Sequence, residues 1–314
     1  MDHPESFTLL GDIGGTNARF ALAHRGRIDE AANFRVAEFD GPLEALRRFL
    51  AAHGSDRRVL HARLAVAGPV SGGRARLTNG AWEFDADALA RSLGLDLVEL
   101  VNDFEALAWS LPRLGPEGAR RIGGGEAVEG EPMVVLGPGT GFGVAGLVFC
   151  ADGARAVATE GGHATLPAAS AREEQILGTL RKEFDHLSIE RVLSGPGLVA
   201  LYKAIGEVDG LAAPEAEGPA IVEAALADRS PAARRALELF CDLLGESAAN
   251  IALTWGARGG VYLAGGIVPR FPDFLARSGF RRRFESKGRM SGYLARIPTF
   301  VVTHPHPALI GLAG

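Results

Sequence analysis

The chain has 314 residues, of which 47% are hydrophobic and 23% charged, with a formal net charge of −5. This composition provides for a sizeable core and excludes a disordered chain, and the length favours two domains. The acidic balance argues against nucleic acid or an anionic membrane surface as a partner. No run approaches the ~20 apolar residues of a membrane span, and residues 1–5 lack the apolar core of a signal peptide. We therefore expect a cytoplasmic protein.

The first part of the chain predicts alternating strands and helices. Residues 7–23 contain two apolar runs joined by a glycine turn, which is typical of a β-hairpin. Residues 42–53 have leucine and phenylalanine at helical spacing. The runs 60–68 and 95–101 are typical of buried strands, and the second leads into a helix near Phe104. This alternation predicts an α/β lobe.

A second lobe is predicted to follow. Residues 111–132 are rich in glycine, proline and charge, and we interpret them as the passage between lobes. Residues 133–149 then repeat the opening pattern of apolar run, glycine turn and apolar run, which suggests two related lobes. We predict an α/β fold with a cleft between a smaller lobe, 1–113 joined by 304–314, and a larger lobe, 114–303.

Helices and loops of the second lobe have clear sequence signals. Ser170 and Glu173 form a capping-box pattern ahead of a helix over 175–184, and Ser230 to Gly256 bound a long amphipathic helix. We expect a loop over 206–219, and then a strand, a glycine pair and a helix from residue 259 onward. The two cysteines, Cys150 and Cys241, lie in apolar segments and are expected to be buried free thiols.

Glycine is in excess, with 42 residues, and three clusters of it follow predicted strands. Glycine lets a phosphate approach backbone N–H groups closely, and a threonine hydroxyl adds a donor. One such cluster alone is more often an ordinary turn, but three together favour a nucleotide phosphate site. The clusters are Gly11-Asp12-Ile13-Gly14-Gly15-Thr16, residues 137–143 with Gly139-Thr140-Gly141 as the candidate phosphate contacts, and Gly265-Gly266.

The better-known phosphate-binding loops do not fit. A Walker A loop needs lysine directly after glycine, and none of the three lysines follows a glycine. The cluster at 137–143 has the wrong spacing for a dinucleotide fingerprint and is followed by another strand-like run. A hairpin-type phosphate clamp remains, in which the nearby acid Asp12 is able to hold Mg²⁺ through water.

Three polar groups are each compatible with a structural role and with a functional role. Asn102-Asp103 stands where a strand meets a helix, which suits either a helix N-cap or a ligand crevice. Glu160 and His163 flank two glycines, and suit a surface turn, a core histidine or a metal site. Glu190 taken alone is typical of a solvated helix acid.

Longer motifs carry a family resemblance. LLGDIGGTNARFAL resembles the first phosphate motif of the sugar kinase, actin and Hsp70 superfamily. Through VNDF, GPGTGFGVA, EGGH, ERVLSGPGL and LAGGIVPRF the chain is similar to bacterial glucokinases over nearly its whole length. The resemblance implies a two-lobed actin-like (ribonuclease H-like) ATPase fold with an interdomain cleft. It also implies a homodimer that transfers the ATP γ-phosphoryl group to the 6-hydroxyl of glucose with Mg²⁺.

The same resemblance implies roles for single residues. Asp103 is expected to be the catalytic base, Asp12 to hold Mg²⁺ through water, and the three glycine clusters to bind ATP. The residues expected to bind the sugar are Asn102, Asp103, Glu160, His163 and Glu190.

Other functions stay open at this point. Thr165-Leu166 stand where many relatives have an acid and an aromatic residue, so another hexose such as mannose is an alternative substrate. A sugar-binding regulator of the same superfamily would need a DNA-binding module ahead of Gly11, where only ten residues stand, and the acidic charge disfavours it. A structural, actin-like protein would not need the polar groups at 102–103, 160–163 and 190.

Overall fold

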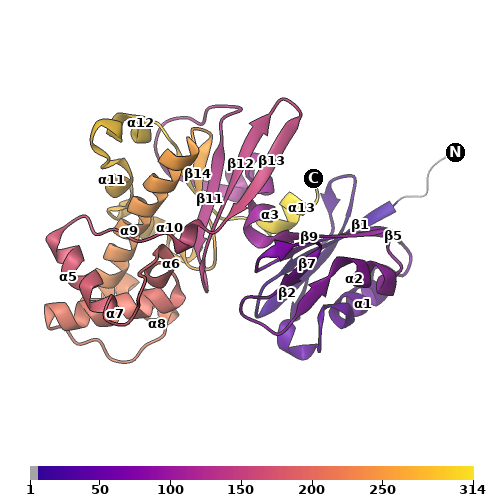
Figure 1. The fold of residues 1–314 in the computed structure, drawn as a ribbon, viewed down its shortest axis with the longest axis horizontal. Helices are drawn as coiled ribbons and strands as arrows, with labels where there is room; N and C mark the ends of the chain where they lie inside the picture. The colour runs from indigo at the N-terminus through magenta and orange to yellow at the C-terminus, as the bar shows by residue number, and fades with distance from the viewer. Residues whose placement is uncertain (1–5) are drawn as a thin grey trace. The chain divides into compact units, whose positions relative to one another are not determined.

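The structure is a computed structural model that describes residues 6–314, so the acidic residues 1–5 lie outside the described part. The chain divides into two compact units. Unit 1 runs as far as Gly115 and includes 155–158 and 304–314, while unit 2 comprises 116–154 and 159–303. Each unit is built around its own sheet (Figure 1). Among residues 6–314 no helix has both the length and the apolar character needed to cross a membrane.

The sheet of unit 1 has the strand order β3-β2-β1-β5-β9, with β4 paired to β2. The predicted opening hairpin is confirmed, since β1 and β2 pair antiparallel, whereas β1, β5 and β9 are parallel. The carboxyl ends of these three strands therefore meet at one edge. The strands are β1 (Ser6–Ile13), β2 (Asn17–His24), β3 (Arg27–Ile28), β4 (Ala32–Arg35), β5 (Arg58–Val66) and β9 (Leu97–Asn102), beside a small sheet of β6 (Val70–Ser71), β7 (Arg74–Arg76) and β8 (Glu83–Asp85).

Helices cover both faces of this sheet, so its central strands are apolar on both sides. The neighbours Leu9 and Leu10 are both fully buried and belong to different cores. One core includes residues of α1 (Pro42–His53) and α2 (Ala86–Leu93), and the other includes α3 (Asp103–Ser110) and α13 (Pro307–Leu312). The short 3₁₀ turns η1 (Val36–Glu38) and η2 (Leu111–Arg113) complete the unit.

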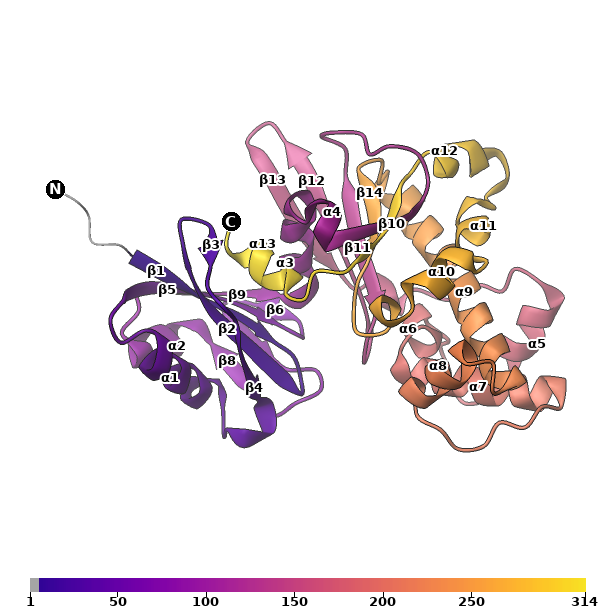
Figure 2. The ribbon, with the colours of Figure 1, turned by 180° about the vertical axis from the view of Figure 1, so that it is seen from behind.

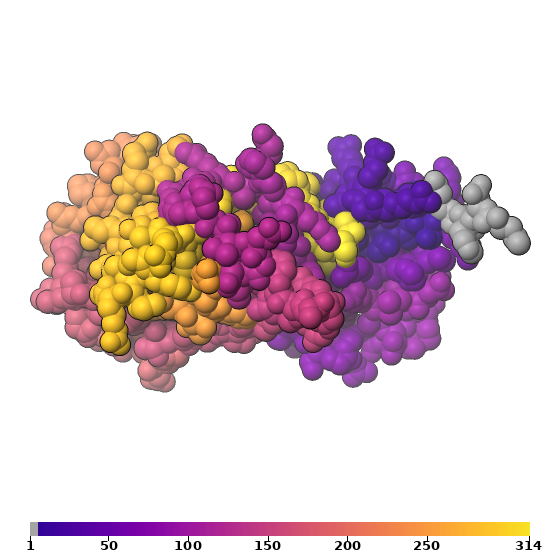
Figure 3. Space-filling view, turned by 90° about the horizontal axis from the view of Figure 1, so that it is seen from above, coloured from indigo at the N-terminus to yellow at the C-terminus, as the bar shows by residue number. Residues whose placement is uncertain are grey.

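The C-terminal segment completes unit 1 from far along the chain. Helix α13 packs on α3, so closely that a Cβ on Gly311 would lie 1.9 Å from the carbonyl oxygen of Ala106. Arg63 on β5 donates to the carbonyl oxygens of Leu312 at 2.6 Å and Gly314 at 2.9 Å. Figure 2 shows α13 beside α3, and in Figure 3 the yellow C-terminal residues lie against the surface of unit 1.

The sheet of unit 2 repeats part of this plan. Its order is β10-β15-β14-β11-β12-β13, in which β11 and β12 form the second predicted hairpin and β11, β14 and β15 are parallel. The series β12-β11-β14-β15 thus has the pairing pattern of β2-β1-β5-β9 in unit 1, as the repeated hairpin predicted. The strands are β10 (Ala119–Gly123), β11 (Met133–Pro138), β12 (Phe142–Cys150), β13 (Gly153–Thr159), β14 (Gly260–Leu263) and β15 (Thr299–Val302). Residues 155–158 of β13 are the part of this sheet that is grouped with unit 1.

The long helix α9 (Pro231–Trp255) organises the helices of unit 2 (Figure 1). Its predicted ends are confirmed, because the Ser230 side chain accepts from Ala233 N and Gly256 ends the helix at a φ of 62°. Fifteen of its residues are buried, and α7, α8 and α11 pack on it. The other helices are α4 (Gly115–Gly118), α5 (Ala171–Leu180), α6 (Ile189–Val192), α7 (Gly195–Asp209), α8 (Gly218–Leu226), α10 (Pro272–Arg277), α11 (Phe280–Glu285) and α12 (Ser291–Ala295), with 3₁₀ turns η3 (Gly161–His163), η4 (Val268–Arg270) and η5 (Gly288–Met290).

Two predicted loops differ from the structure. The loop expected from Gly206 begins only at Gly210, because α7 continues through Gly206 and ends where Gly210 adopts a φ of 63°. The lack of a side chain at 206 instead makes room for Ala213, because a Cβ on residue 206 would lie 2.5 Å from the Cβ of Ala213. The passage 111–132 contains strand β10, which is stabilised by its pairing with β15 rather than by its own sequence.

Two local predictions also need correction. Cys150 is exposed at the last position of β12, and only Cys241 is buried. Helix α5 begins at Ala171, four residues before the expected start, with Ser170 as its N-cap. Glu173 reaches back as a capping box predicts, but its carboxylate accepts from the N–H of Ala169, at 2.8 Å, and not from that of Ser170.

Two helical glycines should respond in opposite ways to alanine. Gly178→Ala in α5 meets nothing within 4 Å and should stabilise the protein by about 0.5–1 kcal/mol. A Cβ on Gly245 in α9 would lie 2.3 Å from the carbonyl oxygen of Phe280, so Gly245→Ala should cost about 1–3 kcal/mol. Urea unfolding of both variants measures the difference. Equal shifts would contradict the close approach of α9 and α11.

Candidate active site

Asn102 ends β9 and caps the helix that follows it. Its Oδ1 accepts from Phe104 N at 3.0 Å and Glu105 N at 3.3 Å, and its Nδ2 donates to the carbonyl oxygen of Gly68 at 3.1 Å. The N-cap interpretation of Asn102 is therefore confirmed. A contact with a sugar would have to use the remaining amide hydrogen, and it stays a prediction.

Asp103 is the first residue of α3 and not its cap. Burial, and then the charge of Asp12, raise the pKa of Asp103 to about 7, against 3.8 for an ordinary aspartate. A hydrogen bond from Phe104 N to Oδ1, at 3.0 Å, acts in the opposite direction. A carboxyl group with a pKa near neutrality, at the carboxyl edge of parallel strands, has the properties of a general base.

Asp12 precedes the last residue of β1 and is paired with a residue that the sequence analysis did not single out. Arg19 lies opposite it in the hairpin and places Nη1 at 3.1 Å from Asp12 Oδ2. Burial raises the pKa of Asp12, while Arg19 and His306 oppose the rise. Counting back from the glycine turn gives this register, so the signal for Arg19 was present in the sequence.

In the first glycine cluster, packing requires glycine at more than one position. Gly11 is buried, and a Cβ there would be 2.7 Å from Leu64 Cδ2. At Gly15 a Cβ would be 2.2 Å from the carbonyl oxygen of Asn79. Gly14 N closes the turn on the carbonyl oxygen of Asn17 at 2.9 Å, which leaves Thr16 exposed at the tip. Phosphate binding at 11–16 remains a prediction beside these structural roles.

The other two glycine clusters lie together in unit 2, because β11 and β14 are parallel neighbours. Gly265 has a φ of 85°, and a Cβ there would be 2.4 Å from the carbonyl oxygen of Pro138. Gly139 faces Gly266, whose N would be 3.9 Å from a Cβ on residue 139. Gly195, at the start of α7, adds a backbone bond to Gly139 at 2.9 Å. The SGPG motif was noted in the sequence, but this residue was not assigned to the site.

Glu190 is not a solvated helix acid. It lies on α6, and its Oε2 accepts from the backbone N–H of Phe142 at 2.8 Å. A Cβ on Gly141 would be 2.4 Å from the same oxygen, so the carboxylate is seated against the glycine hairpin. No local pattern indicates this bond, since it joins segments 48 residues apart.

Glu160 precedes η3 and His163 is its last residue, and both side chains face solvent. Their side chains are 77% and 60% exposed, and His163 Nε2 lies 3.7 Å from Glu160 Oε2. Gly162 between them is buried, and a Cβ there would be 2.1 Å from the carbonyl oxygen of Phe142. The core-histidine alternative is therefore wrong. Nor do residues 6–314 contain a group of three or more His, Cys, Asp or Glu able to hold a metal ion.

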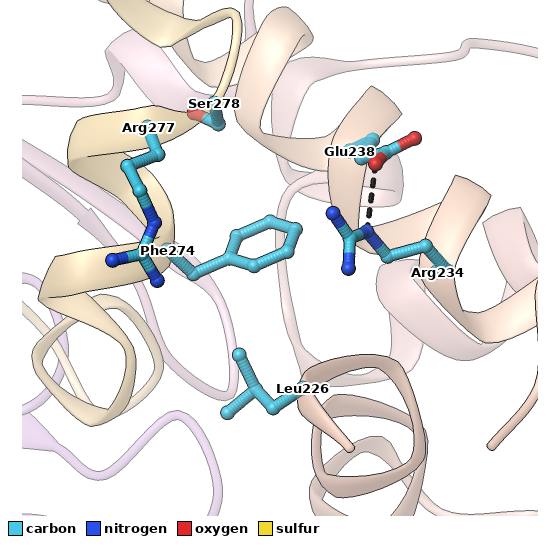
Figure 4. Close-up of a pocket in the computed structure, with 6 residues that line it drawn as sticks. All are labelled: Leu226, Arg234, Glu238, Phe274, Arg277 and Ser278. Carbon is cyan, nitrogen blue, oxygen red and sulfur yellow. Dashed lines mark hydrogen bonds and ion pairs between the residues drawn. The ribbon is translucent and has the colours of Figure 1, made fainter. Parts of the chain in front are cut away.

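The predicted residues thus form two sets, one on each unit. Asp12, Asn102 and Asp103 gather on unit 1, while Glu160, His163, Glu190 and the later glycines gather on unit 2. A cavity of about 150 Å³ between α8, α9 and α10 contains none of them (Figure 4). Its Arg234 is bonded to Glu238 at 2.7 Å and lies over the ring of Phe274. The cavity is lined by Leu226, Arg234, Glu238, Phe274, Arg277 and Ser278.

Comparison with solved structures places this fold among the sugar kinases. A glucokinase from an Antarctic psychrotroph superposes with a TM-score of 0.87 and 38% identity, over 98% of this chain and 97% of that one. A glucokinase of the ROK family from Streptomyces griseus, solved with glucose and AMPPNP, is 20% identical with a TM-score of 0.67, over 98% of each chain, and shares the fold.

Sequence comparison identifies the family. The family model described as Glucokinase matches residues 9–314. The glucokinase of Paramagnetospirillum magneticum is 46% identical over 310 residues, spanning 98% of this chain and 96% of the relative. That of Chromobacterium violaceum is 48% identical over 314 residues, spanning 99% and 89%. The chain belongs to the glucokinase family.

The raised pKa of Asp103 predicts a pH-dependent stability. Below about pH 4 the carboxyl group is neutral in both the folded and the unfolded chain. Between pH 4 and 7 the folded state retains a proton that the unfolded state releases, so stability falls as pH rises until the folded group has ionised. Asp103→Asn lacks this loss, and its stability relative to wild type should increase from pH 4 to 8.

Urea midpoints measured at intervals across that range provide the comparison. Asp40→Asn, which changes an exposed aspartate of the same unit, is the matched control and should follow wild type. Parallel curves of stability against pH for wild type and Asp103→Asn would show that folding does not raise the pKa of Asp103.

Proposed function

We propose that this chain transfers the γ-phosphoryl group of ATP to the 6-hydroxyl of D-glucose, giving glucose 6-phosphate and ADP. As a member of the glucokinase family it is an ATP-dependent sugar kinase. The observation that carries the proposal within the structure is Asp103, a partly buried carboxyl group with a pKa of about 7 at the carboxyl edge of parallel strands. Such a group is able to accept a proton from a hydroxyl at neutral pH.

In this mechanism Asp103 orients the sugar hydroxyl and takes its proton as the oxygen attacks the γ-phosphorus. The bond from that phosphorus to the bridging oxygen breaks, and ADP leaves with the electron pair. Phosphoryl transfer has a loose transition state, so positioning and charge stabilisation contribute more than nucleophile activation. Burial, and then the charge of Asp12, raise the pKa of Asp103 to about 7, which suits proton transfer near neutral pH.

The glycine clusters would hold the phosphates through backbone N–H groups. Mg²⁺, when bound, would offset charge on the transferring phosphoryl group. Asp12 has one oxygen paired with Arg19, so only its other oxygen is available to a hydrated ion. This single carboxylate fits an ion held mainly by phosphates and water, as Mg²⁺ usually is in kinases.

The sugar hydroxyls would be bound by Asn102 and Asp103 of unit 1 and by Glu160, His163 and Glu190 of unit 2. Carboxylates, an amide and an imidazole suit groups that both donate and accept hydrogen bonds. We further propose that the units are the two domains of an actin-like fold, with the sugar bound in a cleft between them. The hairpin and parallel strands that recur in both sheets support the assignment of two related domains. A cytoplasmic homodimer remains a prediction, which a molecular mass in solution would test.

Two alternatives remain for the substrate and the activity. The exposed Thr165 follows the EGGH motif, and its Oγ1 lies 3.0 Å from His186 Nε2. Because this part of the expected sugar site carries a hydroxyl bonded to an imidazole, another hexose such as mannose is the second candidate substrate. A non-catalytic sugar-binding regulator would have no need for a carboxyl group with the pKa of Asp103.

A coupled assay of ADP release tests the reaction. With Mg-ATP, we expect turnover with glucose, weaker turnover with mannose, and loss of turnover when EDTA removes Mg²⁺. A site built on hydroxyl recognition should discriminate strongly between epimers, because a misplaced hydroxyl leaves buried polar groups unpaired. Saturable sugar binding without ADP release from any aldohexose would favour the regulator.

Asp103→Asn should lower kcat by at least about 100-fold, since it removes the base but keeps size and polarity. KM for glucose should change little, because the amide oxygen still accepts a hydrogen bond. Glu160→Gln should do the reverse, raising KM for glucose more than it lowers kcat, and Asp40→Asn is the neutral control. Asn102 caps α3, so the fold should survive the change at 103. A kcat near that of wild type in Asp103→Asn would remove this residue from the mechanism.

A further inference from the structure

The glycine hairpin of unit 2 is held from outside by two bonds. Glu190 Oε2 accepts from Phe142 N at 2.8 Å, and Gly195 N donates to the carbonyl oxygen of Gly139 at 2.9 Å. Glu190 lies on α6 and Gly195 is the first residue of α7, so both partners come from one short segment of the chain. Ser188 and Ser194 fix this segment by capping the two helices, with bonds to Arg191 N at 3.3 Å and to Gly197 N at 3.1 Å.

The seat of the carboxylate depends on the absence of a side chain at Gly141. A Cβ at this position would be 2.4 Å from Glu190 Oε2 and 3.2 Å from its Cδ, so the two could not keep their places together. Hydrogen bonds from an N–H to an ionised carboxylate are about twice as strong as neutral ones. The bond from Phe142 to Glu190 is therefore a strong and specific anchor for the hairpin.

The EGGH motif approaches the same residue at its carbonyl group, which belongs to the next peptide group along the chain. A Cβ on Gly162 would lie 2.1 Å from the carbonyl oxygen of Phe142, so the glycine allows the close approach. The ring of Phe142 is buried. Two segments expected to bind the sugar thus adjoin one residue of the hairpin expected to bind ATP. Of the acids expected in the sugar site of this unit, Glu190 is bonded to the hairpin, whereas Glu160 is 77% exposed.

We propose that Glu190 is a positioning residue for the phosphate hairpin, in addition to its expected contact with the sugar. The inference rests on the proposed function in one respect, namely that the hairpin at 139–141 receives nucleotide phosphates. A loop held in place presents its N–H groups without first having to be ordered, and this raises affinity for the ligand. Glu190 therefore affects nucleotide binding even when no sugar is present.

Calorimetric titration of Mg-ADP, in the absence of sugar, tests this role. Glu190→Ala should weaken ADP binding about fivefold or more, because a hydrogen bond to a charged acceptor is lost. Glu190→Gln retains an oxygen that accepts from Phe142 N but loses the charge of the acceptor, and should weaken ADP binding less than Glu190→Ala does. Glu183→Ala, which removes an exposed acid of the same unit, is the matched control and should leave ADP affinity unchanged.

Gly141→Ala provides an independent approach from the hairpin. Its Cβ should displace the carboxylate and weaken ADP binding as Glu190→Ala does, whereas in the double variant the second change should add little. Thermal melts of all variants identify any that fail to fold, and Glu190→Gln and Gly141→Ala remain informative if Glu190→Ala is one of them.

The possible outcomes separate this inference from the proposed function. Failure of the wild-type protein to bind ADP would overturn both. Normal ADP binding by wild type, with equal affinity in folded Glu190→Ala or with strictly additive effects in the double variant, would overturn the positioning role alone.

Discussion

Two carboxyl groups, Asp12 and Asp103, are brought to one edge of the sheet of unit 1 by the parallel pairing of β1, β5 and β9. Burial removes part of their hydration, and the charge of Asp12 makes a second charge on Asp103 costly. Arg19 offsets the first charge across the hairpin. Asn102 takes the capping role, which leaves Asp103 available for chemistry. The charge and the role of each polar group at this edge therefore depend on the neighbouring polar group.

Unit 2 uses the same sheet plan for a different purpose. Its parallel strands β11 and β14 end in glycines, so backbone groups rather than side chains occupy the edge. The carboxylate of Glu190, which is bonded at this edge, accepts from the backbone. A repeated architecture thus places carboxyl groups at the edge of one unit and glycine backbone at the edge of the other, and the proposed phosphoryl transfer would use both kinds of environment.

The sequence predicted those parts of the fold that are determined locally. Both hairpins have glycine turns, and α9 has a serine cap and a terminal glycine, so their positions could be read from neighbouring residues. Strand β10 could not, because its partner β15 lies at 299–302. The bond from Phe142 to Glu190 and the exposure of Cys150 likewise depend on tertiary packing. Candidate residues were therefore accessible from motifs, but their partners were not.

The position of α13 affects how the chain folds during synthesis. Leu309 and Leu312 cover one core of unit 1 together with Leu10 and Ala65, yet they follow Gly115 by roughly 190 residues. At ribosomal rates of about 5–20 residues per second, that interval lasts roughly 10–40 s. During it, one apolar face of the sheet made first is covered only in part, by α3, and is open to misfolding or chaperone binding. Unit 1 begins to form first, but the core that contains Leu10 closes only when α13 has left the ribosome.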